Sequence, residues 1–157
     1  MTQGMRVNSF STSIPNWLPS LLAMLVLSGA ARAADMKIEA VLVWGTNEQK
    51  SPDRDHKPVN TELKKKLQEL PLKWTSYFEV NRVEFGAPIS NITTVALSKK
   101  CSLEVRNLGQ SKVEVSHLGG GKRVGTSTQS LPKGETLILG GNAPGATSWL
   151  VVIRRLE

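Results

Sequence analysis

The chain has 157 residues and a formal net charge of +7, with 39% hydrophobic and 21% charged residues. This length suits a single domain, and the composition excludes collagen-like and wholly disordered proteins. Because Cys101 is the one cysteine, the chain can form neither an internal disulfide framework nor a cysteine-rich zinc site.

Residues 1–33 have the pattern of a secretory signal peptide. Arg6 is the one charge before Arg32, and an apolar core occupies Leu21–Leu27. Small residues and an A-x-A sequence ending at Ala33 follow this core, as signal peptidase requires. The core is shorter than the ~20 residues of a membrane-spanning helix. We therefore predict cleavage after Ala33, a periplasmic or extracellular location, and no transmembrane span after cleavage. An uncleaved anchor and a buried first helix are the alternatives.

The exported part, residues 34–157, is predicted to begin with an interior strand, a loop and one helix. Residues 37–44 are apolar on both faces, as in a strand within a sheet. Residues 45–59 are polar and contain two prolines, which predicts a long exposed loop. Asn60 can cap a helix whose leucines recur every three or four residues up to Leu70. A helix this short must dock on the sheet to be stable.

Antiparallel strands are predicted for most of the remaining chain. Residues 73–85 are rich in aromatic and β-branched residues, and their inward parity changes near Asn81 and Arg82, which indicates a bulge. Residues 101–106 and 112–117 alternate between apolar and polar positions. This alternation predicts a β-hairpin with one face toward water.

Glycine-rich turns divide the last third of the chain into further short strands. Gly119–Gly121 is predicted to be a hairpin turn and residues 140–145 a loose loop. Residues 149–153 form a second apolar run and are predicted to be another interior strand. Turns at this spacing indicate a mainly β (α+β) fold: an antiparallel β-sandwich or bent sheet with one short helix packed on it. Residues 34–157 are predicted to form one β-rich domain.

Two groups of residues could carry chemistry. Asp53, Asp55 and His56 lie close together in the predicted loop, but they supply too few ligands for a calcium or catalytic zinc site. Cys101 and His117 are both predicted to face the interior. A cysteine–histidine nucleophile would need a third orienting group, and packing in the core is the simpler interpretation. We predict no catalytic residue, no metal and no cofactor.

Basic and aromatic side chains around the helix are the candidate partner-binding residues. The lysines could form a positive surface for an acidic partner or an anionic surface, or they could simply be solvated. The tryptophans could line a groove for a peptide or sugar, or they could pin the helix to the sheet. Basic and aromatic residues are not interleaved as single-strand binders require, so nucleic acid is not a predicted partner. The candidates are Trp44, Lys64, Lys65, Lys66, Trp74 and Tyr77.

The order of segments over residues 37–156 is itself a pattern. An apolar strand ending in W-G-T-N precedes a polar loop and a short leucine helix; W-T-S-Y-F-E-V, T-L-I-L-G-G and a closing apolar strand follow. This order resembles that of small exported bacterial envelope proteins of unassigned function. The resemblance implies a bacterial cell envelope and assigns no functional residue.

Three hypotheses about function follow. The first is a non-enzymatic exported module of the envelope, structural or part of a secretion or surface assembly, that binds another protein by strand addition or through its helix. The second is a basic surface binder of carbohydrate or anionic lipid. The third is a small hydrolase that uses either the Asp53, Asp55 and His56 group or the Cys101 and His117 pair.

Overall fold

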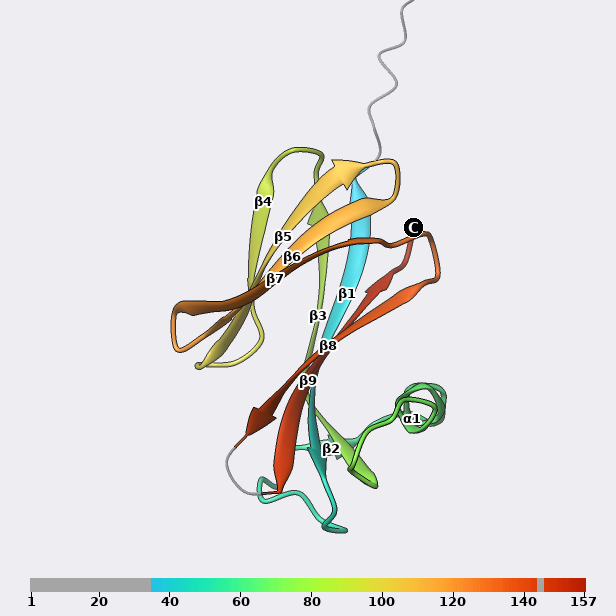
Figure 1. Ribbon diagram of the computed structural model, residues 1–157, viewed down its shortest axis with the longest axis vertical. Helices are drawn as coiled ribbons and strands as arrows, with labels where there is room; N and C mark the ends of the chain where they lie inside the picture. Colours follow the sequence, from blue (N-terminus) through green and yellow to red (C-terminus); the bar gives the residue numbers. More distant parts are fainter. Residues whose placement is uncertain (1–34, 144–145) are drawn as a thin grey trace, which may run out of the picture. The chain divides into compact units, whose positions relative to one another are not determined.

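The computed structural model describes residues 35–143 and 146–157, so the predicted signal peptide and its cleavage site lie outside the described residues. The described part forms two antiparallel sheets and one short helix (Figure 1). This arrangement confirms the predicted mainly β fold with one helix. No helix within the described ranges combines the length and the apolar character needed to cross a membrane.

The first sheet has the strand order β2-β3-β1-β9-β8. The second sheet has the order β4-β5-β6-β7. The strands of the first sheet are β1 (Met36–Thr46), β2 (Lys57–Pro58), β3 (Ser76–Ala87), β8 (Thr136–Ala143) and β9 (Thr147–Arg155). Those of the second are β4 (Ile92–Ala96), β5 (Cys101–Gly109), β6 (Lys112–Gly119) and β7 (Lys122–Ser130), and the helix is α1 (Thr61–Gln68).

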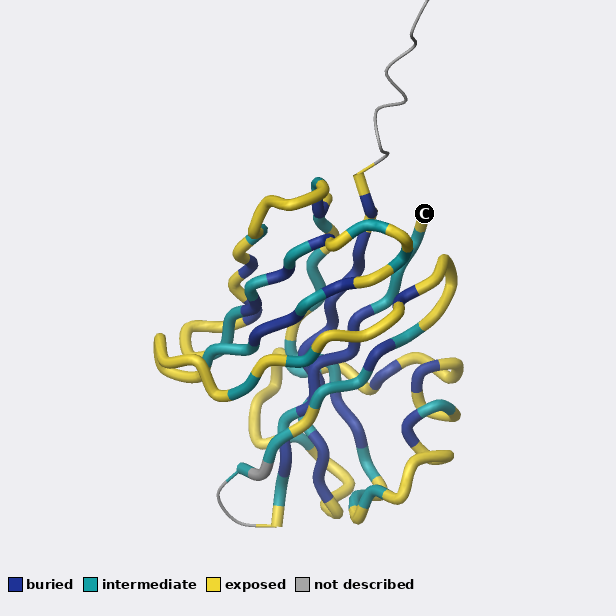
Figure 2. Tube along the Cα trace, turned by 45° about the horizontal axis from the view of Figure 1, so that its top comes forward, coloured by how far each residue is buried: buried dark blue, intermediate teal, exposed yellow. Residues whose placement is uncertain are grey.

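Strand β1 is buried on both of its faces, as its sequence predicts (Figure 2). Ile38 and Leu42 point into the core between the two sheets, where they join Leu103 and Val115 of the second sheet. Val41, on the opposite face of β1, belongs to a second apolar cluster under α1. The first sheet is therefore the middle layer, with the second sheet on one face and α1 on the other.

Helix α1 begins with the predicted cap. The Oδ1 atom of Asn60 accepts a hydrogen bond of 2.8 Å from the backbone N–H of Leu63. Leu63 and Leu67 are buried against the sheet, and burying this stripe is what stabilises so short a helix. Leu70 was predicted to continue the stripe, but α1 ends at Gln68 and Leu70 is 37% exposed. That part of the prediction was wrong because the chain leaves the helix before it makes another turn.

The predicted bulge near Asn81 and Arg82 is confirmed at the neighbouring Val80, because Leu42 pairs with Asn81 and Val43 pairs with Glu79. Two predicted boundaries shift by a few residues. The predicted loop 45–59 is shorter, because β1 continues to Thr46 and residues 57–58 form strand β2. The predicted loop 140–145 is wrong at its start, since β8 runs through both of its first glycines to Ala143.

The glycine turn after β6 is confirmed. Gly120 and Gly121 have φ angles of 58° and 78°, and glycine adopts these left-handed values without steric penalty. The turn joins β6 to β7 as an antiparallel hairpin. The late apolar run is also confirmed as an interior strand, because β9 lies between β1 and β8.

Candidate functional site

Strand β8 forms a free edge of the first sheet. It pairs with β9 on one side, and no strand among the described residues pairs with its other side. Its sequence, TLILGGNA, contains neither a charged residue nor a proline. Natural edge strands are usually protected by lysine, proline or a covering loop, because their unpaired N–H and C=O groups attract other strands. Strand β8 therefore has neither the charged residues nor the proline that usually prevent pairing at such an edge.

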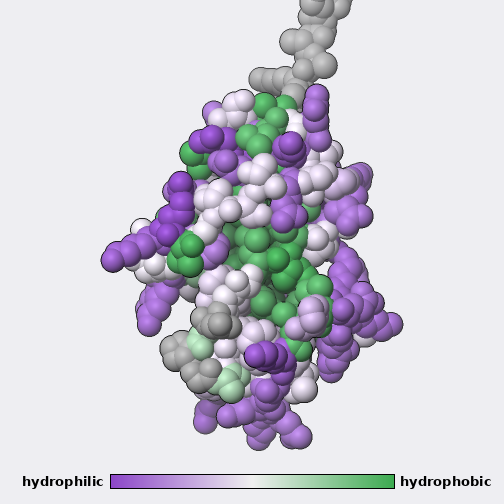
Figure 3. Space-filling view, in the orientation of Figure 1, coloured by the Kyte–Doolittle hydropathy of each residue, from purple (hydrophilic) through white to green (hydrophobic). Residues whose placement is uncertain are grey.

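The inner side of this edge is apolar and only partly covered. Leu139 is half-buried and packs against the core between the sheets. On β7, the facing edge strand of the second sheet, Gly125, Ser127 and Gln129 are the inward positions that pair with His117, Val115 and Val113. Gly125 and Ser127 are small and cover little apolar surface, and the side chain of Gln129 is polar and donates to Ser127 Oγ at 3.2 Å. Figure 3 shows a band of apolar surface across the middle of this face, where Figure 1 places β8.

A cleft lies where the two sheets diverge. In Figure 1 the lower ends of β1, β3 and β9 extend past the second sheet. The cleft has a volume of about 630 Å³, within the ~300–1,000 Å³ that is typical of small-molecule sites. Most of its lining is apolar. The apolar and aromatic residues that line it include Leu42, Trp44, Val80, Leu118, Val124 and Trp149.

Two aromatic rings shape the wall of the cleft. The rings of His117 on β6 and Trp149 on β9 lie 5.0 Å apart between centroids, at an angle of 55°. The Nε2 atom of His117 is buried and has no hydrogen-bond partner among the described residues. The same holds for the Nε1 atom of Trp44 within the described ranges. Buried polar atoms are nearly always paired in folded proteins, so two unpaired nitrogens in one cleft wall are unusual. Arg106 Nε, Ser148 Oγ and Arg154 Nε are also buried and unpaired among the described residues, and none of these three residues lines the cleft.

Cys101 and His117 both line this cleft. The strand register pairs Cys101 with Gly119, two positions from His117 along β6. Burial raises the pKa of the Cys101 thiol and lowers the pKa of the His117 imidazole. Both groups are therefore held in their neutral forms, whereas a reactive cysteine needs a lowered pKa. Both residues are half-buried in the cleft wall, and Cys101 packs against the core between the sheets.

The acidic residues of the predicted loop are held by local hydrogen bonds. The backbone N–H of Asp55 donates to Oδ1 of Asp53 at 3.0 Å, and both carboxylates are exposed. The Nδ1 atom of His56 lies 2.7 Å from the Oγ atom of Ser51. Within the residues that the structure describes, no three metal-ligating side chains lie together.

The aromatic candidates lie on opposite faces of the first sheet. Trp74 and Tyr77 belong to the apolar cluster under α1, and the Oη atom of Tyr77 donates to the carbonyl of Trp74 at 2.9 Å. Tyr77 is only 4% exposed, and its burial raises its pKa. Trp44 lies in the cleft on the other face. Trp44 and Trp74 therefore share no groove, and Trp74 and Tyr77 help to hold α1 on the sheet.

The three lysines of α1 have different surroundings. Lys64 and Lys65 are exposed. The Nζ atom of Lys66 lies 3.6 Å from Oε1 of Glu62 and donates to Oγ1 of Thr136 on β8 at 3.2 Å. Lys66 thus connects the helix to the sheet, and the three lysines do not form one free positive surface.

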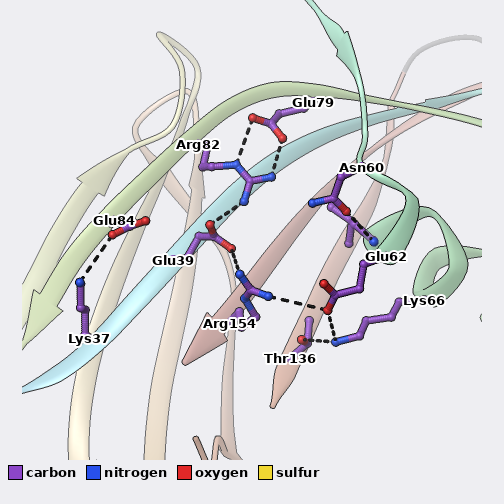
Figure 4. A network of polar contacts seen from close by, with 11 residues as sticks. Lys37, Glu39, Asn60, Glu62, Lys66, Glu79, Arg82, Glu84, Thr136 and Arg154 are labelled. Carbon is purple, nitrogen blue, oxygen red and sulfur yellow. Dashed lines mark hydrogen bonds and ion pairs between the residues drawn. The ribbon is translucent and has the colours of Figure 1, made fainter. Parts of the chain in front are cut away.

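Lys66 belongs to a larger network of charges beneath α1 (Figure 4). Glu39 on β1 is buried and lies between two arginines: Arg82 Nη1 is 2.5 Å from its Oε2, and Arg154 Nη2 is 3.2 Å from its Oε1. Arg82 also binds Glu79 through two hydrogen bonds, of 3.2 and 2.6 Å. The bonds to Glu79 and then to Glu39 raise the pKa of the Arg82 guanidinium. The charges in this network are paired within the fold.

Sequence reasoning missed several residues of the cleft and the edge. Trp149 was seen only as the start of an apolar strand, and Gly141 only as part of a loop. The signal in the sequence was the pair Gly140 and Gly141 after an apolar run. Such glycines also occur in a strand against which a large side chain of the neighbouring strand packs closely. No protein-family model, curated protein or solved structure matches the chain.

Proposed function

We propose that this protein is an exported, non-enzymatic module of the bacterial cell envelope that binds another protein by strand addition. A strand of that other protein pairs with the free edge of β8. The observation that carries the proposal is the free β8 edge, eight residues long and without charge or proline. In strand addition, main-chain hydrogen bonds provide affinity and alternate side chains provide specificity. A structural, secretion or surface assembly is the setting that we propose for this partner.

The composition of the β8 edge supports an added strand with apolar side chains. Leu137 and Leu139 lie on the core side of β8, and they pair with Ile153 and Val151 of β9. Side chains on the same face of a new strand would lie next to these leucines. They would cover the apolar surface that β7 leaves exposed, since its inward positions Gly125, Ser127 and Gln129 carry no apolar side chain.

The export part of the proposal rests on the amino-acid sequence. The apolar core, the small residues and the A-x-A sequence of residues 1–33 support a cleaved signal peptide. A single cysteine that is half-buried and neutral fits an oxidising compartment, because such a thiol reacts slowly. The neutral forms of Cys101 and His117 also favour a binding role over nucleophilic catalysis.

The partner interaction can be tested with one substitution on each edge. Leu139→Lys places an inward-pointing charge on β8, a change that blocks strand pairing in natural sheets. Val124→Lys, at a position that is 60% exposed on β7, adds the same charge to the other edge. We expect a partner cross-linked to the tagged chain in intact cells to be lost with Leu139→Lys and retained with Val124→Lys, with both variants folded by circular dichroism. Retention of the partner by a folded Leu139→Lys chain would contradict the proposal.

A further inference from the structure

The cleft between the diverging sheets has the size and lining of a small-molecule site. Its volume of about 630 Å³ would hold a molecule of roughly one or two fused rings with substituents. Leu42, Val80 and Trp149 come from three neighbouring strands of the first sheet, and Leu118 and Val124 from the second. Because rigid strands supply most of these residues, the site is largely formed in the absence of a ligand.

Two side chains of the lining can offer hydrogen bonds that the protein itself does not use. Trp44 Nε1 and His117 Nε2 are buried and unpaired among the described residues. An indole N–H can only donate, so Trp44 calls for an acceptor atom. Both residues are half-buried and line the cleft. Because neither nitrogen is exposed to solvent in the structure, the ring has to turn for its nitrogen to meet a molecule in the cleft. An acceptor there would replace the water that burial has removed from the indole N–H.

The charges around the cleft favour an uncharged ligand. Among the described residues that line it, Lys100 is the one with a permanent charge, and it lies exposed at the turn between β4 and β5. Cys101 and His117 in the wall are both neutral, since burial disfavours their charged forms. Lys100 and His56 are the lining residues that could pair with a carboxylate, but Lys100 is exposed and His56 already lies 3.8 Å from Oδ2 of Asp53. A carboxylate deep in the cleft would therefore lose its hydration for little gain, and an ammonium group would meet no carboxylate among the described lining residues.

We propose that the cleft binds a small uncharged molecule with an apolar body, of aromatic or compact aliphatic type, and a carbonyl-type oxygen that accepts a hydrogen bond from Trp44 Nε1. Gly141 and Ala143 at the end of β8 line this site, whereas Leu137 and Leu139 do not, and its occupation does not require the partner protein. The inference therefore goes beyond the proposed strand addition.

Prodan, a neutral naphthalene ketone, is a suitable probe, and 6-propyl-2-(dimethylamino)naphthalene is its matched control because a CH2 group takes the place of the carbonyl group. Each is titrated into the purified full chain while the indole ¹H–¹⁵N signals are followed by NMR. We expect prodan to shift the Trp44 signal in a saturable manner and to bind roughly three- to tenfold more tightly than the control, as one neutral hydrogen bond allows. The Trp74 signal, from the opposite face of the sheet, should not move.

Variants then assign the contact. Trp44→Phe keeps an aromatic ring but removes the donor, so prodan affinity should fall by roughly three- to tenfold, while Trp74→Phe should leave it unchanged. Leu139→Lys should also leave it unchanged, because Leu139 does not line the cleft; failure of partner binding and failure of this inference are thus distinguishable. Absence of saturable prodan binding, or binding that leaves the Trp44 signal in place, would overturn the inference. The wild-type titration decides the question even if Trp44→Phe fails to fold.

Discussion

The indole ring of Trp149 fills the space in which a side chain at position 141 would lie. A Cβ atom on Gly141 would come within 2.3 Å of Trp149 Cζ2. The two residues are direct partners across β8 and β9. Glycine at this position therefore allows Trp149 to lie against β8, and from there its ring contacts His117 in the wall of the cleft.

Gly141→Ala should accordingly displace Trp149 and destabilise the domain. Overpacking of this kind costs about 1–3 kcal/mol, and we expect a corresponding fall in the free energy of unfolding in urea. Gly86→Ala on β3 is the matched control, since a Cβ atom there would meet nothing within 4 Å. Equal stability of Gly141→Ala and wild type would show that Trp149 does not depend on the glycine.

The buried carboxylate of Glu39 should contribute strongly to stability. Glu39→Gln keeps the shape of the side chain but removes the charge that Arg82 and Arg154 share. We expect a loss of about 1.5–3 kcal/mol, the range for hydrogen bonds to charged groups, measured by urea unfolding at neutral pH. Glu84→Gln breaks the exposed pair with Lys37, 3.8 Å apart, and should change stability by about 0.5 kcal/mol or less. Similar losses in the two variants would refute this view of the network.

The fold illustrates what sequence patterns can and cannot predict. The strand at residues 37–44 was predictable because a strand that is apolar on both faces must be covered on both. It therefore belongs to a sheet that forms the middle layer of a fold. The cap at Asn60 was predictable because it depends only on local geometry. Trp44 and Trp74 could not be assigned to opposite faces in advance, since Trp74 lies outside any strand and its position follows from tertiary packing. The cleft likewise arises from the divergence of two sheets, which no local pattern records.

Strand boundaries near glycine were the other source of error. Gly140 and Gly141 suggested a loop, because glycine is rare in strand interiors. Their place in β8 makes sense only once Leu150 and Trp149 are seen to cross them on β9. The need for glycine at these two positions is set by β9, which lies later in the chain, and is not visible in the β8 segment itself.

Burial of His117 predicts a loss of stability on the acid side. Its pKa in the folded protein lies below the ordinary value of 6.5, so in the interval beneath 6.5 the unfolded chain binds more protons than the folded one. The free energy of unfolding should therefore fall as the pH decreases through this interval. In His117→Gln this part of the pH dependence should disappear, as measured by urea unfolding from about pH 7.5 down to about pH 5. An identical pH dependence in the variant and the wild type would contradict the assignment.

Cys101 should react slowly with alkylating reagents. Burial raises the pKa of its thiol, and only the thiolate is a good nucleophile. We expect alkylation by iodoacetamide near pH 8 to be at least about tenfold slower in the folded chain than in the urea-unfolded chain. The rate is followed by mass spectrometry, and the unfolded chain provides the reference. Equal rates would mean that the thiol is open and reactive, which would revive the hydrolase hypothesis.

The most direct test of the account is amide hydrogen exchange along β8. It is measured on the chain alone and on the chain in complex with the partner that the cross-linking experiment identifies. In the chain alone, the β8 amides that point away from β9 should exchange rapidly, because nothing in the described structure pairs with them. In the complex the same amides should be protected, while the edges at β4 and β7 remain unchanged. Rapid exchange of those β8 amides in the intact complex would contradict strand addition at this edge.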